Sequence, residues 1–489
     1  QKTAYEIGVR LVGSEMCIRD RPVLGFASDD GYGYAPHLDG SITNLSIFWV
    51  IPFVGILLSI AIFPLFFPDF WHHHFGKVSF FWAVLFVVPF LVKEGLSVTL
   101  YELLHVGLLE YVPFIILLLA LFTISGGVSL TGSFVGKPIV NVTIIFIGTV
   151  LASWMGTTGA AMLLIRPLIR ANRDRKHKVH VIVFFIFLVA NVGGSLTPLG
   201  DPPLFLGFLK GVDFFWTTKA MFMPMLFLVI CLLVIFFAMD TYFFGKELQP
   251  DVDDQESEKL GIEGSFNLVL LAGVVGGVLL SGFWKPGIHY EIYHVHMELQ
   301  NLIRDGFLIG LTYVSWKMTS KEIRQANEYT WFPIVEVGKL FAGIFVTIIP
   351  AIAILKAGSN GALSSVVSSV SQDGEPINYM YFWLTGILSS FLDNAPTYLV
   401  FFNTAGGNPF VLMGDMSNTL LAISAGAVFM GAMTYIGNAP NFMVKSIAEQ
   451  AGISMPSFFG YMTKYSIPIL VPVSYTHLRA HETDSYLVC

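Results

Sequence analysis

The chain is poor in charged residues and has almost no cysteine. Asp, Glu, Lys and Arg make up 12% of its 489 residues, hydrophobic residues make up 54%, and the mean hydropathy is +0.69. Soluble domains carry about 25% charged residues, so this composition excludes an ordinary soluble fold. The lack of a basic surplus also argues against nucleic acid as a partner. We therefore expect an all-α polytopic membrane protein whose main partner is the lipid bilayer.

Two of the three cysteines, Cys17 and Cys489, fall in terminal segments that match nothing else in the chain. Residues 1–21 and 472–489 read as translated sequencing adaptor, because one oligonucleotide and its reverse complement would encode parts of both. The remaining cysteine, Cys231, lies alone in an apolar run, so no disulfide is expected. We interpret residues 22–45 as an extracytoplasmic tail and the helix that ends at residue 471 as truncated, because its last apolar run is too short to span a bilayer.

Long apolar runs predict the membrane-crossing segments. They occur near residues 46–67, 79–92, 112–128, 179–209, 217–244, 264–283, 301–316, 331–355 and 417–444. Two further runs, 139–169 and 379–402, are interrupted midway, leaving halves of roughly a dozen residues that are too short to span a bilayer. Each interrupted run is predicted to form a re-entrant helical hairpin.

The interruptions recur at a fixed offset of 237 residues. Residues 153–159 align with residues 390–396, and residues 197–203 align with residues 434–440. Glycine, proline and polar residues at matched positions of two halves are typical of the discontinuous helices that line transporter substrate sites. The chain is thus predicted to contain two repeats, each with one hairpin and one discontinuous transmembrane helix.

The basic residues predict the orientation of these repeats. The densest basic segment, residues 166–178, is assigned to the cytoplasm by the positive-inside rule. Counting spans from it makes the two hairpins enter from opposite sides, which gives inverted-topology repeats. We place the first half at residues 46–244, a cytoplasmic linker at 245–263 and the second half at 264–471.

Asp201 and Asp393 are the carboxylates that fall within the breaks. Insertion scales put the cost of a carboxylate at bilayer depth at roughly 2.5 to 3.5 kcal/mol, so such residues are retained where they line a cavity or bind a cation. Hydroxyl and amide side chains nearby supply the oxygen ligands that sodium prefers. The predicted cation and proton site comprises Asp201, Asp393, Asn394, Asn438, Thr157, Thr158, Thr197, Ser153, Ser390, Thr434 and Asn441. The residues predicted to break the helices are Gly156, Gly159, Pro198, Gly200, Pro202, Pro203, Pro396, Gly437 and Pro440.

Sodium or lithium ions and protons are the expected transported species, and no cofactor or transition metal is expected. Histidines cluster at residues 72–74 and at His289, His294 and His296, but neither cluster has the ligand spacing of a zinc site. Glu94, Glu102 and Glu110 recur in a stretch with an amphipathic helical period, which predicts an interfacial helix.

The strings Gly193 to Pro203, Asp393 to Pro396 and Gly437 to Asn441 resemble those of the ion transporter superfamily. Within it the chain is most similar to NhaD-type sodium:proton antiporters and their citrate transporter relatives, over about residues 45–471. The resemblance implies an inverted-repeat fold in a bacterial inner membrane, often as a homodimer. The hairpin tips lack the Ser-Asn-Thr signature of carboxylate carriers, which favours cation exchange.

Three functions are consistent with the two aspartates. Competition of a proton and a sodium ion for one carboxylate predicts sodium:proton antiport by alternating access. Sodium- or proton-coupled transport of citrate or a dicarboxylate is the alternative, because half-helix N-termini can hold an anion. An intramembrane aspartyl protease would also use two aspartates, but its signature differs from the residues around Asp201 and Asp393. We therefore predict a transporter and not an enzyme.

Overall fold

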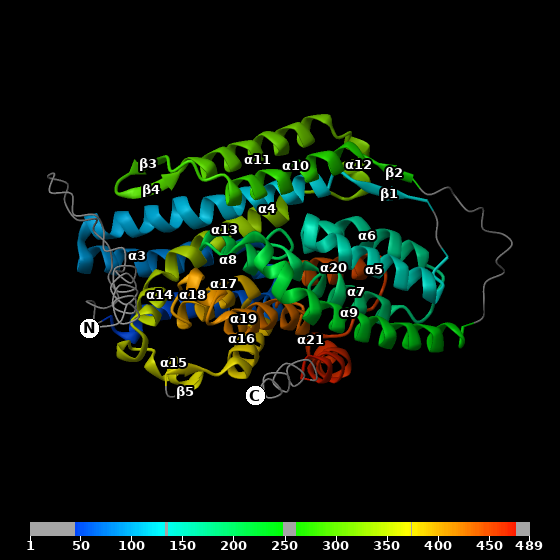
Figure 1. The fold of residues 1–489 in the computed structure, drawn as a ribbon. Helices are drawn as coiled ribbons and strands as arrows, with labels where there is room; N and C mark the ends of the chain where they lie inside the picture. Colours follow the sequence, from blue (N-terminus) through cyan, green and yellow to red (C-terminus); the bar gives the residue numbers. More distant parts are fainter. Residues whose placement is uncertain (1–44, 133–134, 248–260, 373, 476–489) are drawn as a thin grey trace, which may run out of the picture. The chain divides into compact units, whose positions relative to one another are not determined.

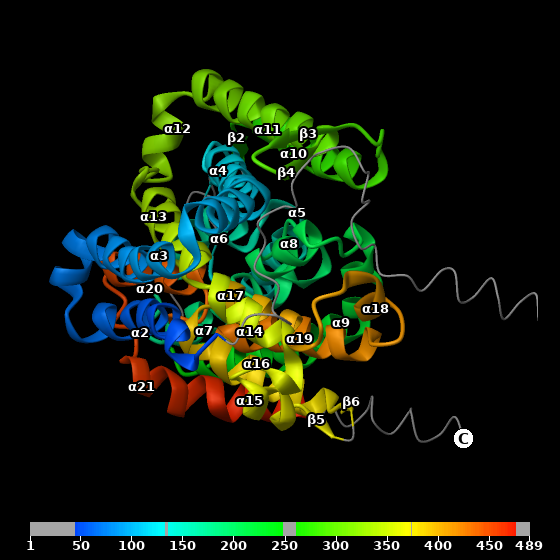
Figure 2. The same ribbon diagram turned by 90° about the vertical axis from the view of Figure 1, so that its left-hand side faces the viewer.

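The computed structural model describes residues 45–132, 135–247, 261–372 and 374–475 (Figures 1 and 2). All of them belong to one compact unit, His37–Cys489. The described part is built of helices, together with three short antiparallel ribbons. Residues 1–21 and most of 472–489, which we interpreted as adaptor, lie outside the described residues, as do most of the predicted tail and linker.

The described N-terminal part is dominated by one long helical run. A proline begins α3, Gly95 adopts a positive φ of 83° within it, and a π-helical turn joins α3 to α4. The elements are η1 (Ile47–Val50), α2 (Ile51–Phe66), α3 (Pro68–Val106), η2 (Gly107–Tyr111) and α4 (Val112–Ser125).

The remainder of the first half contains a helix pair and a broken helix. The pair breaks at Gly156 and the broken helix is interrupted from Val189 to Asp201, as the glycines and prolines there require. The elements are β1 (Ser129–Thr131), α5 (Pro138–Met155), α6 (Thr157–Ala171), α7 (Val179–Leu188), η3 (Val192–Leu196), α8 (Pro202–Leu209) and α9 (Phe214–Phe244).

The end of the predicted linker forms β2, which pairs with β1, and the second half continues through a β-hairpin between α10 and α11. These elements are β2 (Gly261–Glu263), α10 (Phe266–Phe283), β3 (His289–Ile292), β4 (Val295–Glu298), α11 (Leu299–Met318), α12 (Lys321–Ala326), α13 (Phe332–Thr347), α14 (Ile349–Lys356), η5 (Gly358–Asn360), α15 (Ser364–Ser369), β5 (Ser371–Gln372) and β6 (Glu375–Pro376).

A second helix pair and a second broken helix follow. The pair breaks at Asp393, and the broken helix is interrupted between Met433 and Ala439. These elements are α16 (Asn378–Leu392), α17 (Asn394–Thr404), α18 (Pro409–Met413), α19 (Ser417–Met430), η6 (Gly431–Met433), α20 (Ala439–Gln450), α21 (Phe458–Tyr461) and η7 (Met462–Ser466).

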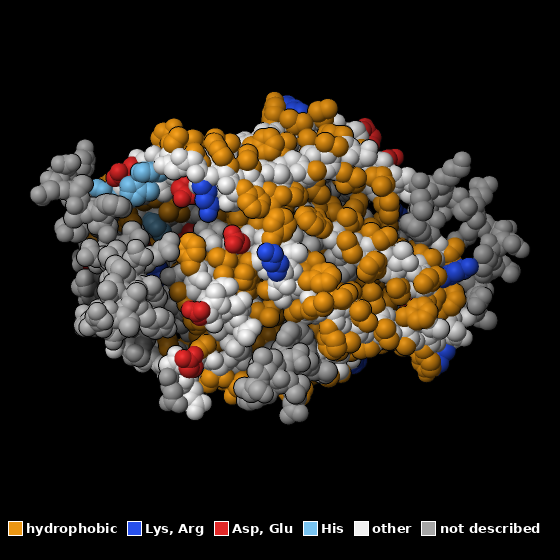
Figure 3. Space-filling model, viewed as in Figure 1, with side chains coloured by type: hydrophobic (Ala, Val, Ile, Leu, Met, Phe, Trp, Pro, Cys, Tyr) orange, Lys and Arg blue, Asp and Glu red, His pale blue; other side chains and the backbone are white. Residues whose placement is uncertain are grey.

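By length and composition, six helical segments of the described part could cross a membrane, or seven if the bent pair α13 and α14 is one span. The six are Ile47–Phe66, Pro68–Ser125, Pro138–Met155, Val179–Leu196, Phe214–Phe244 and Phe266–Phe283. Hydrophobic side chains cover much of the surface in Figure 3, as expected for a protein that faces lipid. The chain is therefore an all-α, multi-pass membrane protein.

Three details differ from the sequence predictions. The first half of the hairpin, α5, has 18 residues and is long enough to span alone. The runs predicted at 79–92 and 112–128 lie within one assigned helical stretch, Pro68–Ser125, which is kinked at Gly95 because the backbone there leaves helical geometry. α11, predicted to span at 301–316, is not among the candidate spans, because Arg304, Asp305 and Lys317 lower its hydropathy.

The breaks of the helix pairs and of the broken helices lie among buried, closely packed helices. The segment Val179–Leu196, which contains α7, is 89% buried. α8 packs against α17, and α20 packs against α6. Each broken helix therefore places its second part against the helix pair of the other half.

Candidate functional site

The two helix pairs break with the same backbone geometry. Gly156 has φ 79° and ψ 149°, and Asp393, 237 positions later, has φ 78° and ψ 139°. Residues other than glycine rarely adopt this backbone conformation. The backbone of Asp393 is therefore strained, whereas that of its counterpart Gly156 is not. The Asp393 carboxylate accepts a hydrogen bond from the Ala395 N–H at 3.1 Å, which caps α17.

Matched hydroxyls fasten the breaks of each half together. Thr197 donates to the carbonyl of Ser153, and Thr434 donates to the carbonyl of Ser390. The Ser153 hydroxyl donates to the Gly193 carbonyl at 2.5 Å, and the Ser390 hydroxyl donates to Met430 at 2.9 Å. These four predicted site residues therefore hold backbone in place, and none of them lines the cavity described below.

Asp201 is the centre of the site. It is 1% exposed and precedes α8, and it receives hydrogen bonds from both halves. Its Oδ1 accepts from the Thr157 hydroxyl at 3.1 Å and from Asn438 Nδ2 at 2.8 Å. Its Oδ2 accepts from Asn394 Nδ2 at 2.6 Å. Side chains of both halves thus donate three hydrogen bonds to the Asp201 carboxylate.

The contact between Asp201 and Asn438 joins equivalent positions of the two halves, 237 residues apart. The two residues also share an extended backbone, with φ of −142° and −152°. The Asn438 amide additionally donates to the Ala190 carbonyl at 3.1 Å and to Asn191 Oδ1 at 3.3 Å. One carboxylate and one amide thus meet where the two halves touch.

Asn191 belongs to this network, and sequence reasoning missed it. It is fully buried, and its Nδ2 donates to Asn441 Oδ1 at 2.7 Å. The Asn441 amide in turn donates to the carbonyls of Gly431 and Thr434, both at 2.9 Å. The available signal was an isolated amide within an apolar run, which must find a polar partner when buried.

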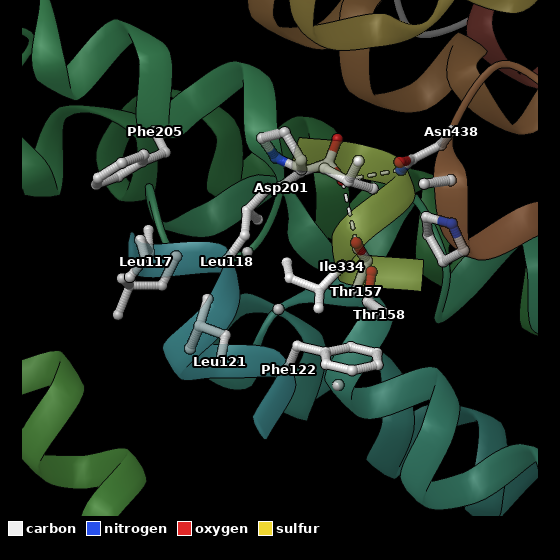
Figure 4. A pocket seen from close by; sticks show the side chains of 18 of the residues that line it. Leu117, Leu118, Leu121, Phe122, Thr157, Thr158, Asp201, Phe205, Ile334 and Asn438 are labelled. Carbon is white, nitrogen blue, oxygen red and sulfur yellow. Dashed lines mark hydrogen bonds between the residues drawn. The ribbon is translucent and has the colours of Figure 1, made fainter. Parts of the chain in front are cut away.

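A cavity adjoins Asp201 (Figure 4). Apolar side chains from α4 and α13 form one wall, and the tip of the first helix pair and both broken helices form the other. Among the described residues, those lining it include two aspartates but no lysine or arginine. The lining residues are Leu117, Leu118, Leu121, Phe122, Met155, Gly156, Thr157, Thr158, Gly159, Pro198, Leu199, Gly200, Asp201, Pro202, Phe205, Pro333, Ile334, Val337, Phe341, Asp393, Asn438, Ala439, Pro440 and Met443.

Several of the predicted glycines permit close backbone approach. A Cβ on Gly200 would lie 2.1 Å from the Gly194 carbonyl oxygen, and one on Gly437 would lie 2.5 Å from that of Gly431. Gly159 packs against Ser125, where a Cβ would meet Oγ at 2.5 Å. Prolines 202 and 203, 396 and 440 occupy the first turns of α8, α17 and α20, where a missing N–H costs least.

Four helices begin at the site, and their N-termini carry partial positive charge. They are α6 at Thr157, α8 at Pro202, α17 at Asn394 and α20 at Ala439. The Oδ1 atom of Asn394 is buried and has no hydrogen-bond partner among the described residues. The helix N-termini can therefore stabilise negative charge at the site. The Asn394 side chain also offers an amide oxygen without a partner beside Asp201.

The histidine clusters and the acidic stretch lie apart from this cavity. No group of three or more His, Cys, Asp or Glu side chains within the described ranges is arranged to hold a metal ion. Glu102 and Glu110 are only 6% and 5% exposed, so both carboxylates lie against protein, and the interfacial helix stays a prediction. Lys210, distant in sequence, provides the counter-charge for Glu110 at 2.5 Å.

Comparison with known proteins identifies the class of this molecule. Residues 42–478 match the family described as "Putative citrate transport". Two uncharacterized transporters, from Mycobacterium bovis and Mycobacterium tuberculosis, are each 24% identical over 354 residues, covering 69% of this chain and 76% of the relative. Both the family and these relatives are transporters, not proteases. The chain belongs to this citrate transport family, and it is a multi-pass membrane transporter.

Proposed function

We propose that the protein is a secondary active transporter of a bacterial inner membrane, working by alternating access with cation binding at Asp201. The observation that carries this proposal is the burial of Asp201 between donors from both halves. Motion of one half against the other would change these contacts. Binding at Asp201 would then be coupled to the side from which the cavity is reached.

Exchange of sodium for protons is the leading form of this proposal. The cavity lining supplies the Asp201 and Asp393 carboxylates, and Asn394 offers an unpartnered amide oxygen. These are the hard oxygen ligands that sodium prefers. Among the described lining residues no lysine or arginine is present to pair with a carboxylate substrate. Protonation of Asp201 would displace the cation, which is sufficient for antiport.

Transport of citrate or a dicarboxylate, coupled to sodium or protons, is the second candidate. The family match favours it. The four helix N-termini at Thr157, Pro202, Asn394 and Ala439 also favour it, because such ends bind anions through their N–H groups. In this case Asp201 would bind the coupling cation, and the anion would bind at the helix ends.

Everted membrane vesicles that hold a pH gradient test the role of Asp201. Added sodium should dissipate the gradient with the wild-type protein, and Asp201→Asn should slow this response about tenfold or more, since losing an interaction worth about 1.4 kcal/mol is tenfold in rate. The double variant Asp201→Asn/Asn438→Asp returns one carboxylate to the same contact. It should respond faster than the single variant.

Labelled citrate uptake on the same vesicles separates the two candidates. Sodium-dependent citrate uptake without any sodium-driven proton movement would replace antiport by the second candidate. Undiminished activity of Asp201→Asn in both assays would disprove the proposed cation site. Thr143→Ser, on the exposed side of α5, serves as a control that should leave both activities unchanged.

A further inference from the structure

Two adjoining depressions lie beside α10 and α11, away from the central cavity. The first, here the α10–α11 groove, is lined by Gly273, Gly276, Gly277, Leu280, Ser281, Trp284, Gln300, Ile303, Arg304 and Phe307. The second, here the basic cleft, is lined in part by Lys210, Lys219, Lys285 and His296. Ser281 and Arg304 line both, so the two depressions meet at Arg304.

Arg304 is buried in an apolar setting with one nitrogen unused. Its side chain is 2% exposed. Nε donates to Asp305 Oδ1 at 2.8 Å, and Nη1 donates to Asn301 Oδ1 at 3.2 Å. Nη2 is buried and has no hydrogen-bond partner among the described residues. An unpaired buried donor on a charged group costs about 1 to 3 kcal/mol or more, so this nitrogen requires an acceptor.

The groove is open because glycines line α10. A Cβ on Gly276 would meet no atom within 4 Å. Large apolar side chains border it, with Leu280 52% exposed and Phe307 47% exposed. Figure 3 shows hydrophobic side chains over the face to which α10 and α11 contribute, with few charges. An exposed apolar groove of this kind suits an acyl chain.

The basic cleft supplies the complementary charge. Lys219 and Lys285 are exposed and form no ion pair with another described residue. Asp213, Glu298 and Asp305 also line this cleft, which disfavours a ligand with several negative charges. A phosphodiester carries only one. Arginine is well suited to phosphate oxygens because its N–H groups match their geometry.

We propose that α10 and α11 bind one anionic phospholipid. Its phosphate would lie at Arg304 Nη2, near Lys219 and Lys285, and one of its acyl chains would lie in the α10–α11 groove. Arg304 lies five residues beyond the start of α11 at Leu299, or about 7.5 Å along the helix. This is a depth that a phosphate near the membrane surface can reach.

Native mass spectrometry of the purified full chain tests the lipid site. Titration with phosphatidylglycerol should give one bound lipid per chain at a several-fold lower concentration than phosphatidylcholine. Gly276→Leu fills the groove without a backbone clash and leaves Arg304 intact, so it should weaken phosphatidylglycerol binding about tenfold. Arg304→Gln should abolish the preference for the anionic lipid.

Gly306→Leu is the matched control, because a Cβ there also meets no atom within 4 Å and Gly306 does not line the groove. It should bind phosphatidylglycerol like the wild type. Wild-type binding by Gly276→Leu would overturn the proposal. So would the loss of a dimer peak in Gly276→Leu with lipid binding unchanged, since the groove would then hold a second copy of the chain.

Discussion

At the scale of single residues, the two halves differ where the chemistry is concentrated. Thr157 and Asn394 occupy equivalent positions, yet both donate to the same carboxylate, that of Asp201. Asp393 stands where the first half has Gly156, and it keeps the glycine-like conformation. The two positions share one backbone geometry, but only Asp393 carries a side chain there. This indicates that its carboxylate is kept at a cost in stability.

Replacing Asp393 measures that cost. Asp393→Gly removes the strain of the positive φ, worth about 1 to 3 kcal/mol, whereas Asp393→Ala keeps it and loses the cap of α17. We expect the glycine variant to be more stable than the alanine variant by about 1 kcal/mol. Thermal unfolding in detergent measures the difference, and greater stability of Asp393→Ala would contradict the argument.

At the scale of elements, α8 connects the site to a distant ion pair. It begins after Asp201 and is followed by Lys210, whose Nζ lies 2.5 Å from Glu110 Oε1. Glu110 belongs to the π-helical turn η2, within the long run from α3 to α4. Their side chains are 22% and 6% exposed, so the pair is largely withdrawn from water and fixes α8 against η2.

Breaking this pair should destabilise the protein. Glu110→Gln should lower the free energy of unfolding by about 2 kcal/mol, somewhat less than for a fully buried pair, because it leaves the Lys210 ammonium without its counter-charge. The double variant Glu110→Gln/Lys210→Gln should regain most of the loss, as chemical denaturation would show.

The exposed pair Lys445 and Glu449 on α20 is the control for this measurement. Its removal should cost no more than about 0.5 kcal/mol. If removal of either pair lowered the free energy of unfolding by the same amount, burial of Glu110 would make no difference to the strength of its ion pair.

At the scale of the whole molecule, the two helix pairs, α5 with α6 and α16 with α17, meet near their breaks. Their opposite ends, here called their bases, lie apart. In Figure 1, α6 lies beside β1 toward the right, and α17 lies beside α14 toward the left. Asp240, fully buried in α9, accepts hydrogen bonds from Asn141 of α5 and His180 of α7 at the base of the first pair. This arrangement supports the proposal that the pairs enter the membrane from opposite sides.

Labelling with a membrane-impermeant thiol reagent tests that topology. With Cys17, Cys231 and Cys489 changed to serine, Lys176→Cys, in the exposed loop after α6, should be labelled only from the cytoplasmic side. Phe410→Cys, on α18 and 78% exposed in the wild type, should be labelled only from the opposite side. Labelling of both from one side would rule out inverted repeats.

The sequence by itself determined the protein class and the positions of the breaks, and it selected Asp201 as a candidate site residue. Composition, glycines and prolines act locally, and a matched offset of 237 needs no knowledge of packing. Only the tertiary structure decided which polar groups meet. It turned Ser153, Ser390, Thr197 and Thr434 toward backbone carbonyls. It also brought Asn191 to Asn438 and Lys210 to Glu110, because these partners lie far apart in the chain and are joined only when the helices pack.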